Sequence, residues 1–571
     1  MKKQARKTLT LLILTMFFLT MIYSVFLKEL KGPFIEGDEI GYWTHAATML
    51  GWDWKSALSE TFPWYSYGYS LVLMPFLAIS SDLEVAYRLA IILNIIFILG
   101  SYLISIAIVK KISRLNNIQT IMICFICSLY PAYIFQAQIA WSEIFLIFMI
   151  WLSFLMFLYY LENKKVSFCL ICTCIVAYCF IIHNRALGIL ISYIVTMTIL
   201  VWKKRIPPKH LIVSSICIFI FLCIDGYLKV IFETIERTYY RSGYANANSF
   251  SGVFSIILSI FSFEGIKLLF LSFLGKIWYL ISSSYGLVIF GVGFLAFQLR
   301  GLHFKSRETD DDKMLYFLFI ALCIIFTIAI SSVYMVNRTG EVLPGDRIRI
   351  DPLFYGRYNE SVVGILMLLG MIFLVEADFT TIKFIKEKMI LFFSCYFISS
   401  LILEAQITHF ENIYLNTPCV VGIYFYKMFF DNFSILKCTI IVMTFLIVCF
   451  IFKKIIKQKG RWLILCGTIL SSFFMITAFY EIDEYIIKQQ KSIYGQAKID
   501  FYKSLIQYSG DIYIFGDEIS KIPLVLMNHE VKRINSFENN VLNNGDIVVI
   551  EWKDFESVWK TNKFTLKNRF G

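Results

Sequence analysis

Two adjacent acids, Asp38 and Glu39, stand in the stretch Phe34–Trp43, directly after the first hydrophobic segment. If a short helix begins just before them, Asp38, Tyr42 and His45 share one helix face. Neighbouring helical side chains diverge by roughly 100°, so only one acid can point directly into a given pocket. A carboxylate beside a tyrosine and a histidine suits a base that takes a proton from a hydroxyl. The alternative is a solvated first turn whose acids complement the helix dipole.

Further polar residues stand at the ends of hydrophobic runs. Glu143 follows Trp141, and His183 and Arg185 occupy a turn between two runs that are nearly all apolar. A charge near bilayer depth costs about 2.5–3.5 kcal/mol on insertion scales, so such residues usually face partners or a cavity. Arg185 has an alternative interpretation as a side chain that snorkels to the interface.

A third group, Arg357 and Tyr358, stands at the mouth of another hydrophobic run. Arginine is planar, always charged and able to bind a phosphate through two donors, which suits a lipid-linked phosphate at the membrane interface. The alternative is an aromatic belt with one snorkelling arginine.

Composition defines the class of protein. The chain has 571 residues, of which 58% are hydrophobic and 16% charged, and its mean hydropathy is +0.69. The apolar residues form long runs, which indicates a polytopic membrane protein. The formal charge of +12 is spread over short basic clusters between these runs, as the positive-inside rule expects. We therefore expect no nucleic-acid partner.

The hydrophobic runs predict an all-α bundle of about 13 transmembrane helices. The expected spans are Thr8–Leu27, Ala86–Val109, Ile118–Gln138, Glu143–Leu161, Val166–Ile182, Ala186–Trp202, Leu211–Phe232, Gly275–Leu299, Met314–Met335, Ser361–Val375, Met389–Leu403, Leu436–Phe452 and Trp462–Tyr480. Interfacial helices are expected along the outer surface within Tyr42–Ser81 and at Val253–Leu274.

Charge sets the expected orientation. Lysines and arginines precede the first span and gather in every second connection, so the N-terminus is expected in the cytoplasm. An odd number of spans puts the C-terminus outside the cytoplasmic membrane. We divide the chain into a membrane domain, residues 1–480, and a small extracytoplasmic α/β domain, residues 481–571. Strands are expected at Asp511–Gly516 and Asp546–Trp552, with a helix at Ile519–His529 between them.

The sequence predicts no nucleotide-binding site. No P-loop, H-E-x-x-H, G-x-S-x-G or Rossmann fingerprint stands where it would carry meaning, and the cytoplasmic loops are too short for a nucleotide-sugar site. Any activated substrate is therefore expected to reach the outer face already attached to a lipid.

Together these features resemble the GT-C superfamily of membrane glycosyltransferases. The chain is similar to bacterial relatives of the protein O-mannosyltransferases and of the lipid A aminoarabinose transferase. The resemblance rests on the acidic pair after the first span, the aromatic segment leading to Tyr87-Arg88, the Trp141-Ser-Glu143 and His183-Asn-Arg185 motifs, and the external tail.

The resemblance implies a polyprenyl-phosphate sugar as donor, with Asp38 as base and Glu39 supporting the base or the acceptor. A sugar phosphate already has a good leaving group, so the site needs one base and cations for the departing phosphate. Direct displacement would invert the anomeric centre. No cofactor is assigned; the metal requirement stays open, with a divalent cation as one option. Expected contacts of the donor phosphate are His183, Arg185, Arg357 and Tyr358, and candidate substrate contacts are Tyr42, His45, Arg88, Glu143, Asp346, Arg347 and Glu404.

Membrane lipids and an extracytoplasmic glycan, lipid or protein acceptor complete the expected partners. Two other functions stay open. One is a polysaccharide polymerase or ligase of the O-antigen type, which also has many spans and outer arginines. The other is a flippase or transporter of lipid-linked sugars, for which ionisable residues near mid-membrane and internal repeats are expected.

Overall fold

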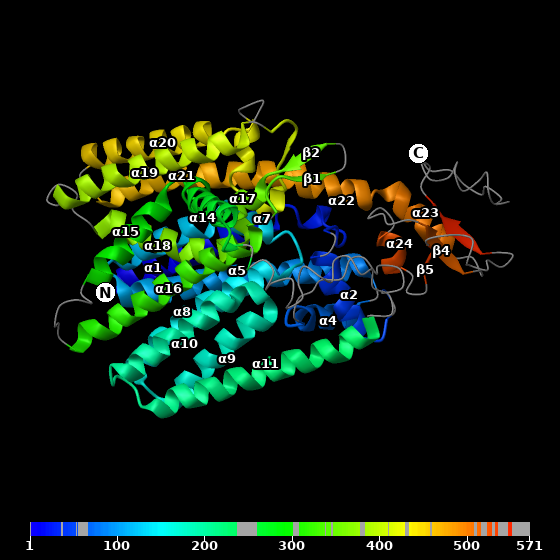
Figure 1. The fold of residues 1–571 in the computed structure, drawn as a ribbon, viewed down its shortest axis with the longest axis horizontal. Helices are drawn as coiled ribbons and strands as arrows, with labels where there is room; N and C mark the ends of the chain where they lie inside the picture. Colours follow the sequence, from blue (N-terminus) through cyan, green and yellow to red (C-terminus); the bar gives the residue numbers. More distant parts are fainter. Residues whose placement is uncertain are drawn as a thin grey trace.

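The structure is a computed structural model in which the following residues are described: 2–35, 38–52, 54, 67–80, 82–236, 258, 260–300, 308–336, 338–343, 346–376, 383–408, 410–428, 433–456, 459–506, 511–515, 522–527, 531–534 and 546–550. Long helices run roughly side by side in one bundle, and the C-terminal segments extend from one end of it (Figure 1).

The first half of the chain supplies one long helix after another. The α-helices are α1 (Lys2–Ser24), α2 (Glu39–Met49), α4 (Ser70–Ile79), α5 (Leu83–Ile112), α6 (Asn117–Ser128), α7 (Pro131–Gln136), α8 (Ser142–Asn163), α9 (Val166–Ile182), α10 (Leu187–Trp202) and α11 (Pro208–Glu236), with short 3-10 helices η1 (Leu27–Glu29) and η2 (Asn184–Ala186). Local signals set several ends: Asp82 caps α5 by accepting from the Glu84 N–H, and Asn116 forms a capping box with Gln119 at α6.

The second half adds the helices α14 (Phe263–Ser283), α15 (Leu287–Leu299), α16 (Glu308–Met335), α17 (Asp351–Phe354), α18 (Glu360–Glu376), α19 (Lys383–Ile407), α20 (Ile435–Ile455) and α21 (Lys459–Glu481), and the 3-10 helices η5 (Gly356–Tyr358), η6 (Thr417–Cys419) and η7 (Tyr424–Met428). A small sheet in the order β1-β2-β3 joins Glu341–Leu343, Arg347–Arg349 and Ile413–Tyr414; β1 and β2 are antiparallel, and β2 and β3 are parallel.

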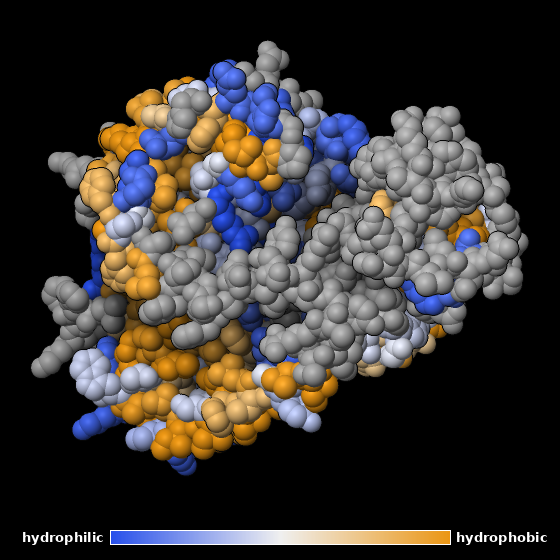
Figure 2. All heavy atoms as spheres, turned by 45° about the vertical axis from the view of Figure 1, so that its right-hand side comes forward, coloured by the Kyte–Doolittle hydropathy of each residue, from blue (hydrophilic) through white to orange (hydrophobic). Residues whose placement is uncertain are grey.

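The prediction of a multi-pass helical membrane protein is confirmed. Among the described residues, ten helices are long and apolar enough to cross a membrane, and the bent pair Asp351–Tyr358 with Glu360–Glu376 raises this number to eleven. Of the two remaining predicted spans, Val166–Ile182 is the shorter apolar helix α9, whereas Ile118–Gln138 is wrong in its bounds because it is divided into α6 and α7, with Pro131 at the start of α7. Broad areas of apolar side chains cover the bundle (Figure 2), and on α11 they include the exposed Ile212, Phe219 and Tyr227. Such a surface suits contact with lipid.

Another predicted span is wrong in its bounds. The expected helix Gly275–Leu299 is two helices, α14 and α15, which separate at Gly286, where φ is +84°. The described part of the segment predicted as interfacial, from residue 263 on, belongs to α14, a candidate span. Glu264 and Lys267, whose charges suggested an interfacial helix, lie at the start of α14 and pair with each other at 3.1 Å. Residues 253–257 and 259 lie outside the described residues.

The tail begins without a break in the helix. After α21 the chain continues through a π-helical turn, η8 (Ile482–Ile487), into α22 (Lys488–Ile493) and then α23 (Gln496–Ile506). The expected boundary at residues 480 and 481 therefore falls inside a continuous helix. Beyond α23, the parallel strands β4 (Ile512–Phe515), β5 (Lys532–Ile534) and β6 (Ile547–Val549), in the order β5-β4-β6, and α24 (Ile522–Met527) form the predicted α/β unit.

Candidate functional site

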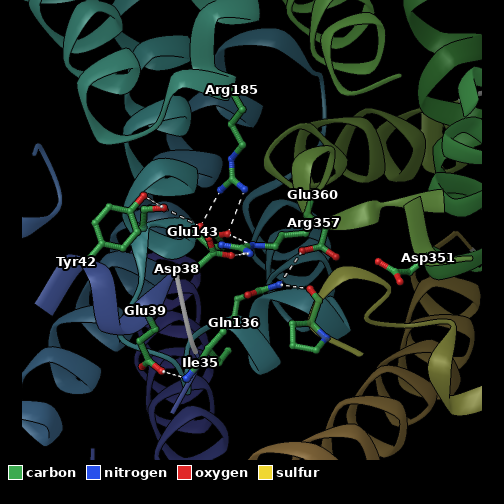
Figure 3. Close-up of polar contacts among 12 residues, drawn as sticks. Ile35, Asp38, Glu39, Tyr42, Gln136, Glu143, Arg185, Asp351, Arg357 and Glu360 are labelled. Atoms are coloured by element: carbon green, nitrogen blue, oxygen red, sulfur yellow. Dashed lines mark hydrogen bonds and ion pairs between the residues drawn. The ribbon is translucent and has the colours of Figure 1, made fainter. Parts of the chain in front are cut away.

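Four charged side chains from distant parts of the chain meet at the tail end of the bundle: Asp38, Glu143, Arg185 and Arg357, the charged cluster (Figure 3). Arg185 binds Glu143 through two nitrogens, with Nη1–Oε1 and Nη2–Oε2 distances of 3.1 and 2.8 Å. Arg357 donates from Nε to Glu143 and from Nη1 to Asp38. The Asp38 side chain is 22% exposed and the other three are at most 7% exposed, so Asp38 is the member that solvent reaches best.

Arg357 owes its position to a break in a helix. It lies in η5, at the end of the segment Asp351–Tyr358, and this segment and α18 differ in direction by 74°. The turn packs directly on Tyr279, because a Cβ on Gly356 would overlap the tyrosine ring. The Arg357 guanidinium also lies 3.8 Å above the Trp141 ring, which precedes α8. A cation over an indole face is attracted by the ring quadrupole, so Trp141 helps to hold Arg357 between the two acids.

Arg185 and Glu143 come from the ends of neighbouring helices. Glu143 lies in the first turn of α8. Arg185 lies in η2, where its N–H donates to His183 Nδ1 at 3.2 Å. Tyr358 closes this side: its ring lies 5.4 Å from the Arg185 guanidinium and 5.8 Å from the His183 ring. The four expected phosphate contacts, including Arg357, are therefore brought together.

His183 is neutral in these surroundings. Burial first, and then the positive charge of Arg185, holds the pKa of His183 well below its usual 6.5. At neutral pH it can orient the Arg185 turn, but it cannot donate a proton as an imidazolium.

Glu39 faces away from the charged cluster, as Figure 3 shows. Its carboxylate accepts from the backbone N–H groups of Phe34 (2.9 Å), Ile35 (3.2 Å) and Ala140 (3.0 Å) and from Tyr87 Oη (2.6 Å). Burial raises the pKa of this carboxyl to about 7, while these hydrogen bonds work in the opposite direction. Glu39 thus anchors the chain before Asp38 instead of facing a substrate.

The short helix expected beside Asp38, with Tyr42 and His45 on it, is α2. Asp38 immediately precedes α2, and Tyr42 donates to Ser142 Oγ (3.1 Å), which donates to Glu143 (2.8 Å). Tyr42 therefore reaches the cluster through one hydroxyl. His45 is buried and stacks on the Tyr67 ring, with the ring centres 4.4 Å apart.

Two other candidates have structural contacts elsewhere. Arg88 donates to the carbonyl groups of Lys28 (2.6 Å) and Leu30 (3.2 Å), which fixes the end of the first membrane helix. Glu404 caps α20, accepting from Ser434 Oγ at 2.8 Å and from the Ile435 N–H at 2.6 Å. Neither belongs to the charged cluster.

Asp346 lies in the turn between β1 and β2, and Arg347 is the first residue of β2. Both residues are exposed, and the Arg347 guanidinium lies 5.1 Å from the ring of Tyr414 on β3.

Sequence reasoning missed Glu360. This buried acid begins α18, three residues after Arg357, and accepts from Tyr279 Oη (2.6 Å) and Gln136 Nε2 (3.1 Å). Gln136 also donates to the Pro418 carbonyl at 3.4 Å, so the network ties the helix break to α7 and η6. The position of Glu360 three residues after Arg357 was visible in the sequence, but its partners Tyr279 and Gln136 lie far from it along the chain.

Within the described residues, no group of three or more His, Cys, Asp and Glu side chains is arranged to hold a metal ion. The charges of Asp38 and Glu143 are met by arginines instead.

The fold is the one seen in ArnT, which confirms at the level of the fold the resemblance that the sequence implied. The particular similarity is to ArnT from Cupriavidus metallidurans: the apo structure matches with a TM-score of 0.53 and 12% identity over 96% of this chain and 94% of ArnT. ArnT bound to undecaprenyl phosphate matches with a TM-score of 0.52 and 11% identity, over 98% and 96% of the two chains.

At 11–12% identity, the similarity to ArnT shows a shared fold only.

An Archaeoglobus fulgidus oligosaccharyltransferase, AglB, in complex with an inhibitory peptide and a dolichol-phosphate, matches at a TM-score of 0.45 and 10% identity over 93% of this chain and 64% of AglB. No family model matches the sequence, and neither does any curated protein.

Proposed function

We propose that the protein is a membrane glycosyltransferase that moves a sugar from a polyprenyl phosphate to an acceptor outside the cytoplasmic membrane. The observation that carries this proposal is the charged cluster: two arginines converge on the acids Asp38 and Glu143, and only Asp38 is appreciably exposed. The cluster thus offers phosphate-binding cations beside one accessible base.

Unused hydrogen-bond donors support an anionic ligand. In the described part of the chain, Arg185 Nε and Trp141 Nε1 are buried without a hydrogen-bond partner. Buried polar groups normally have partners, so two leftover donors beside two arginines favour an acceptor-rich ligand such as a phosphate.

The reaction needs few groups. The acceptor hydroxyl gives its proton to the Asp38 carboxylate while its oxygen attacks the anomeric carbon. The bond from that carbon to the phosphate oxygen breaks with inversion, and the polyprenyl phosphate departs with one additional negative charge. Arg185 and Arg357 stabilise this charge, which develops only in the transition state.

Donor binding also prepares the base. In the structure Arg357 is shared between Glu143 and Asp38. A phosphate that takes one side of the Arg357 guanidinium competes with Asp38 for the same donor, so donor binding weakens the ion pair and leaves Asp38 to the acceptor. This exchange predicts that the donor binds before the acceptor.

The fold supports the lipid part of the proposed donor. ArnT has been solved bound to undecaprenyl phosphate, and this chain shares its fold over nearly its full length. The polyprenyl phosphate donor, the extracytoplasmic side of the site and the role of Asp38 are our proposals.

The test is direct transfer. Purified protein in lipid nanodiscs is incubated with radiolabelled undecaprenyl-phosphate sugars, taken from a panel of hexoses and pentoses, together with cell-envelope fractions. We expect label to move from the lipid to an acceptor for at least one sugar, and Asp38→Asn to slow that transfer about 10²–10⁴-fold. A panel without transfer or hydrolysis, for a protein that binds undecaprenyl phosphate, would refute the proposal.

A further inference from the structure

The segment before Asp38 is held by the helix that leads into the tail. The Lys31 N–H donates to Gln490 Oε1 at 3.0 Å, and Gln490 Nε2 donates to the Gly32 carbonyl at 2.7 Å. Tyr494 Oη donates to the Pro33 carbonyl at 2.5 Å. Three consecutive residues of the segment are therefore bound by two side chains that follow the π-helical turn, and both of those side chains are buried.

Packing reinforces these hydrogen bonds. A Cβ on Gly32 would lie 2.5 Å from Tyr494 Oη, so glycine allows the tyrosine to lie directly against the backbone of the segment. Lys31 Nζ also donates to the Tyr494 carbonyl at 3.3 Å. The Phe34 ring lies 6.3 Å from the Tyr485 ring of η8.

The segment is held from the other side as well. Glu39 accepts from the N–H groups of Phe34 and Ile35, the next two residues. Five residues in a row, Lys31–Ile35, thus have their backbone held, either by the tail helix or by Glu39. Asp38 lies three residues beyond Ile35.

We infer that Gln490 and Tyr494 are positioning residues for Asp38, and that the helix leading into the tail is part of the site. The inference rests on the proposed function, because it assigns these residues to the placement of its base. A misplacement of about 1 Å can cost roughly 10²-fold in rate, so a loosened segment should lower turnover strongly.

The connection also links the α/β unit to the chemistry. Gln490 and Tyr494 lie between α21, in the bundle, and α23, which packs on α24 of the tail (Figure 1). This helix therefore connects the α/β unit to the segment that precedes Asp38.

The test uses Gln490→Leu, Tyr494→Phe and the double variant of the full-length protein in nanodiscs. We expect kcat for transfer from the undecaprenyl-phosphate sugar to fall roughly 10-fold in each single variant and up to about 10²-fold in the double variant. Binding of undecaprenyl phosphate should stay within about twofold, because both arginines are also held by Glu143, whose contacts the variants leave in place. Amide hydrogen exchange of residues 30–35 should become faster.

Two matched variants serve as controls. Gln496→Leu changes an exposed glutamine of α23 that donates to Asp500. Tyr285→Phe removes a buried hydroxyl contact to Thr477 of α21 (3.1 Å), away from the segment. Both should keep kcat and the exchange of residues 30–35 at wild-type values.

The outcomes separate the two claims. Wild-type kcat in the double variant, while Asp38→Asn is strongly slowed, overturns the positioning role and leaves the proposed function intact. Full activity of Asp38→Asn overturns the assignment of the base itself. If the double variant loses undecaprenyl phosphate binding, the positioning role is judged from the single variant Tyr494→Phe, which removes only one oxygen atom. A wild-type kcat in Tyr494→Phe then overturns the inference.

Discussion

The adjacent acids Asp38 and Glu39 should give opposite phenotypes when each is replaced by its amide. Asp38 is partly exposed and faces Arg357, whereas Glu39 is fully buried among four donors. Asp38→Asn keeps the shape and removes the base. We expect kcat to fall about 10²–10⁴-fold, the usual contribution of general-base catalysis. At about 1.36 kcal/mol for each factor of ten, this is roughly 2.7–5.4 kcal/mol of transition-state stabilisation.

The stability of Asp38→Asn should fall by less than the roughly 3–5 kcal/mol that removing one partner of a fully buried ion pair costs. Arg357 is 4% exposed but keeps Glu143 as an ionised partner, and the amide oxygen of the asparagine can still accept from it. Undecaprenyl phosphate binding should persist or improve, because the competitor for Arg357 has lost its charge.

The main effect of Glu39→Gln should be a loss of folding stability. The amide oxygen can take over two of the four donors, and the amide NH₂ then faces the other two. Each buried donor left without an acceptor costs about 1–3 kcal/mol, so the expected loss is about 2–6 kcal/mol of unfolding free energy. Measurements at pH 8 lie above the Glu39 pKa of about 7, where the wild-type carboxylate is ionised.

The assay compares Tm, undecaprenyl phosphate binding and kcat for the two variants at matched expression. The reasoning is refuted if Glu39→Gln has wild-type Tm and no turnover while Asp38→Asn turns over normally. That result would exchange the roles of the two acids.

Three further predictions concern the cations, the histidine and the topology. Arg357→Ala should weaken undecaprenyl phosphate binding severely, and Arg357→Lys nearly as much, because a lysine cannot reproduce the planar guanidinium. Arg185→Ala should act similarly. Unchanged dissociation constants in all three variants would remove these arginines from the site. Because the folded-state pKa of His183 is depressed, its contribution to stability is present above the unfolded pKa of about 6.5 and is lost as the pH falls below it. Tm should therefore fall less between pH 7 and pH 5 in His183→Gln than in the wild type, and equal slopes would contradict this. A topology reporter fused after Gly571 should be active outside the cytoplasm and one inserted near Asp310 inside it; both on one side would contradict the proposed orientation.

The sequence selected the members of the charged cluster without predicting that they pair with one another. Asp38 was selected as a base, Arg185 and Arg357 as phosphate contacts and Glu143 as a substrate contact, and in the structure these four residues form ion pairs with one another. Helix geometry also predicted that only one of the adjacent acids could face the pocket. Which acid does so depends on the Ala140 N–H and Tyr87, far along the chain from Glu39, and no local pattern reveals such contacts.

Two other candidate residues, Arg88 and Glu404, make structural contacts instead. Arg88 and Glu404 also stand near helix ends, but their partners are backbone groups of neighbouring segments. A polar residue at a helix end satisfies unpaired backbone groups as readily as it binds a ligand, and its type does not distinguish the two. The split between α14 and α15 was missed for another reason: the short polar stretch Ser282–Gly286 ends in a glycine, a turn signal, but long apolar runs on both sides outweighed it.

The balance of charge in the cluster explains how the proposed site could hold two arginines at the edge of a membrane before any donor arrives. Two guanidinium groups and two carboxylates sum to zero, which limits the cost of burying them. Glu143 is 2% exposed and is bound by both arginines and by Ser142, whereas Asp38, which pairs with Arg357, is 22% exposed and lies nearer to an incoming ligand. A donor phosphate should therefore displace Asp38 rather than Glu143. The incoming negative charge then replaces that of Asp38 at Arg357, so the arginine is never left unpaired, and the displaced carboxylate becomes the base beside the bound sugar.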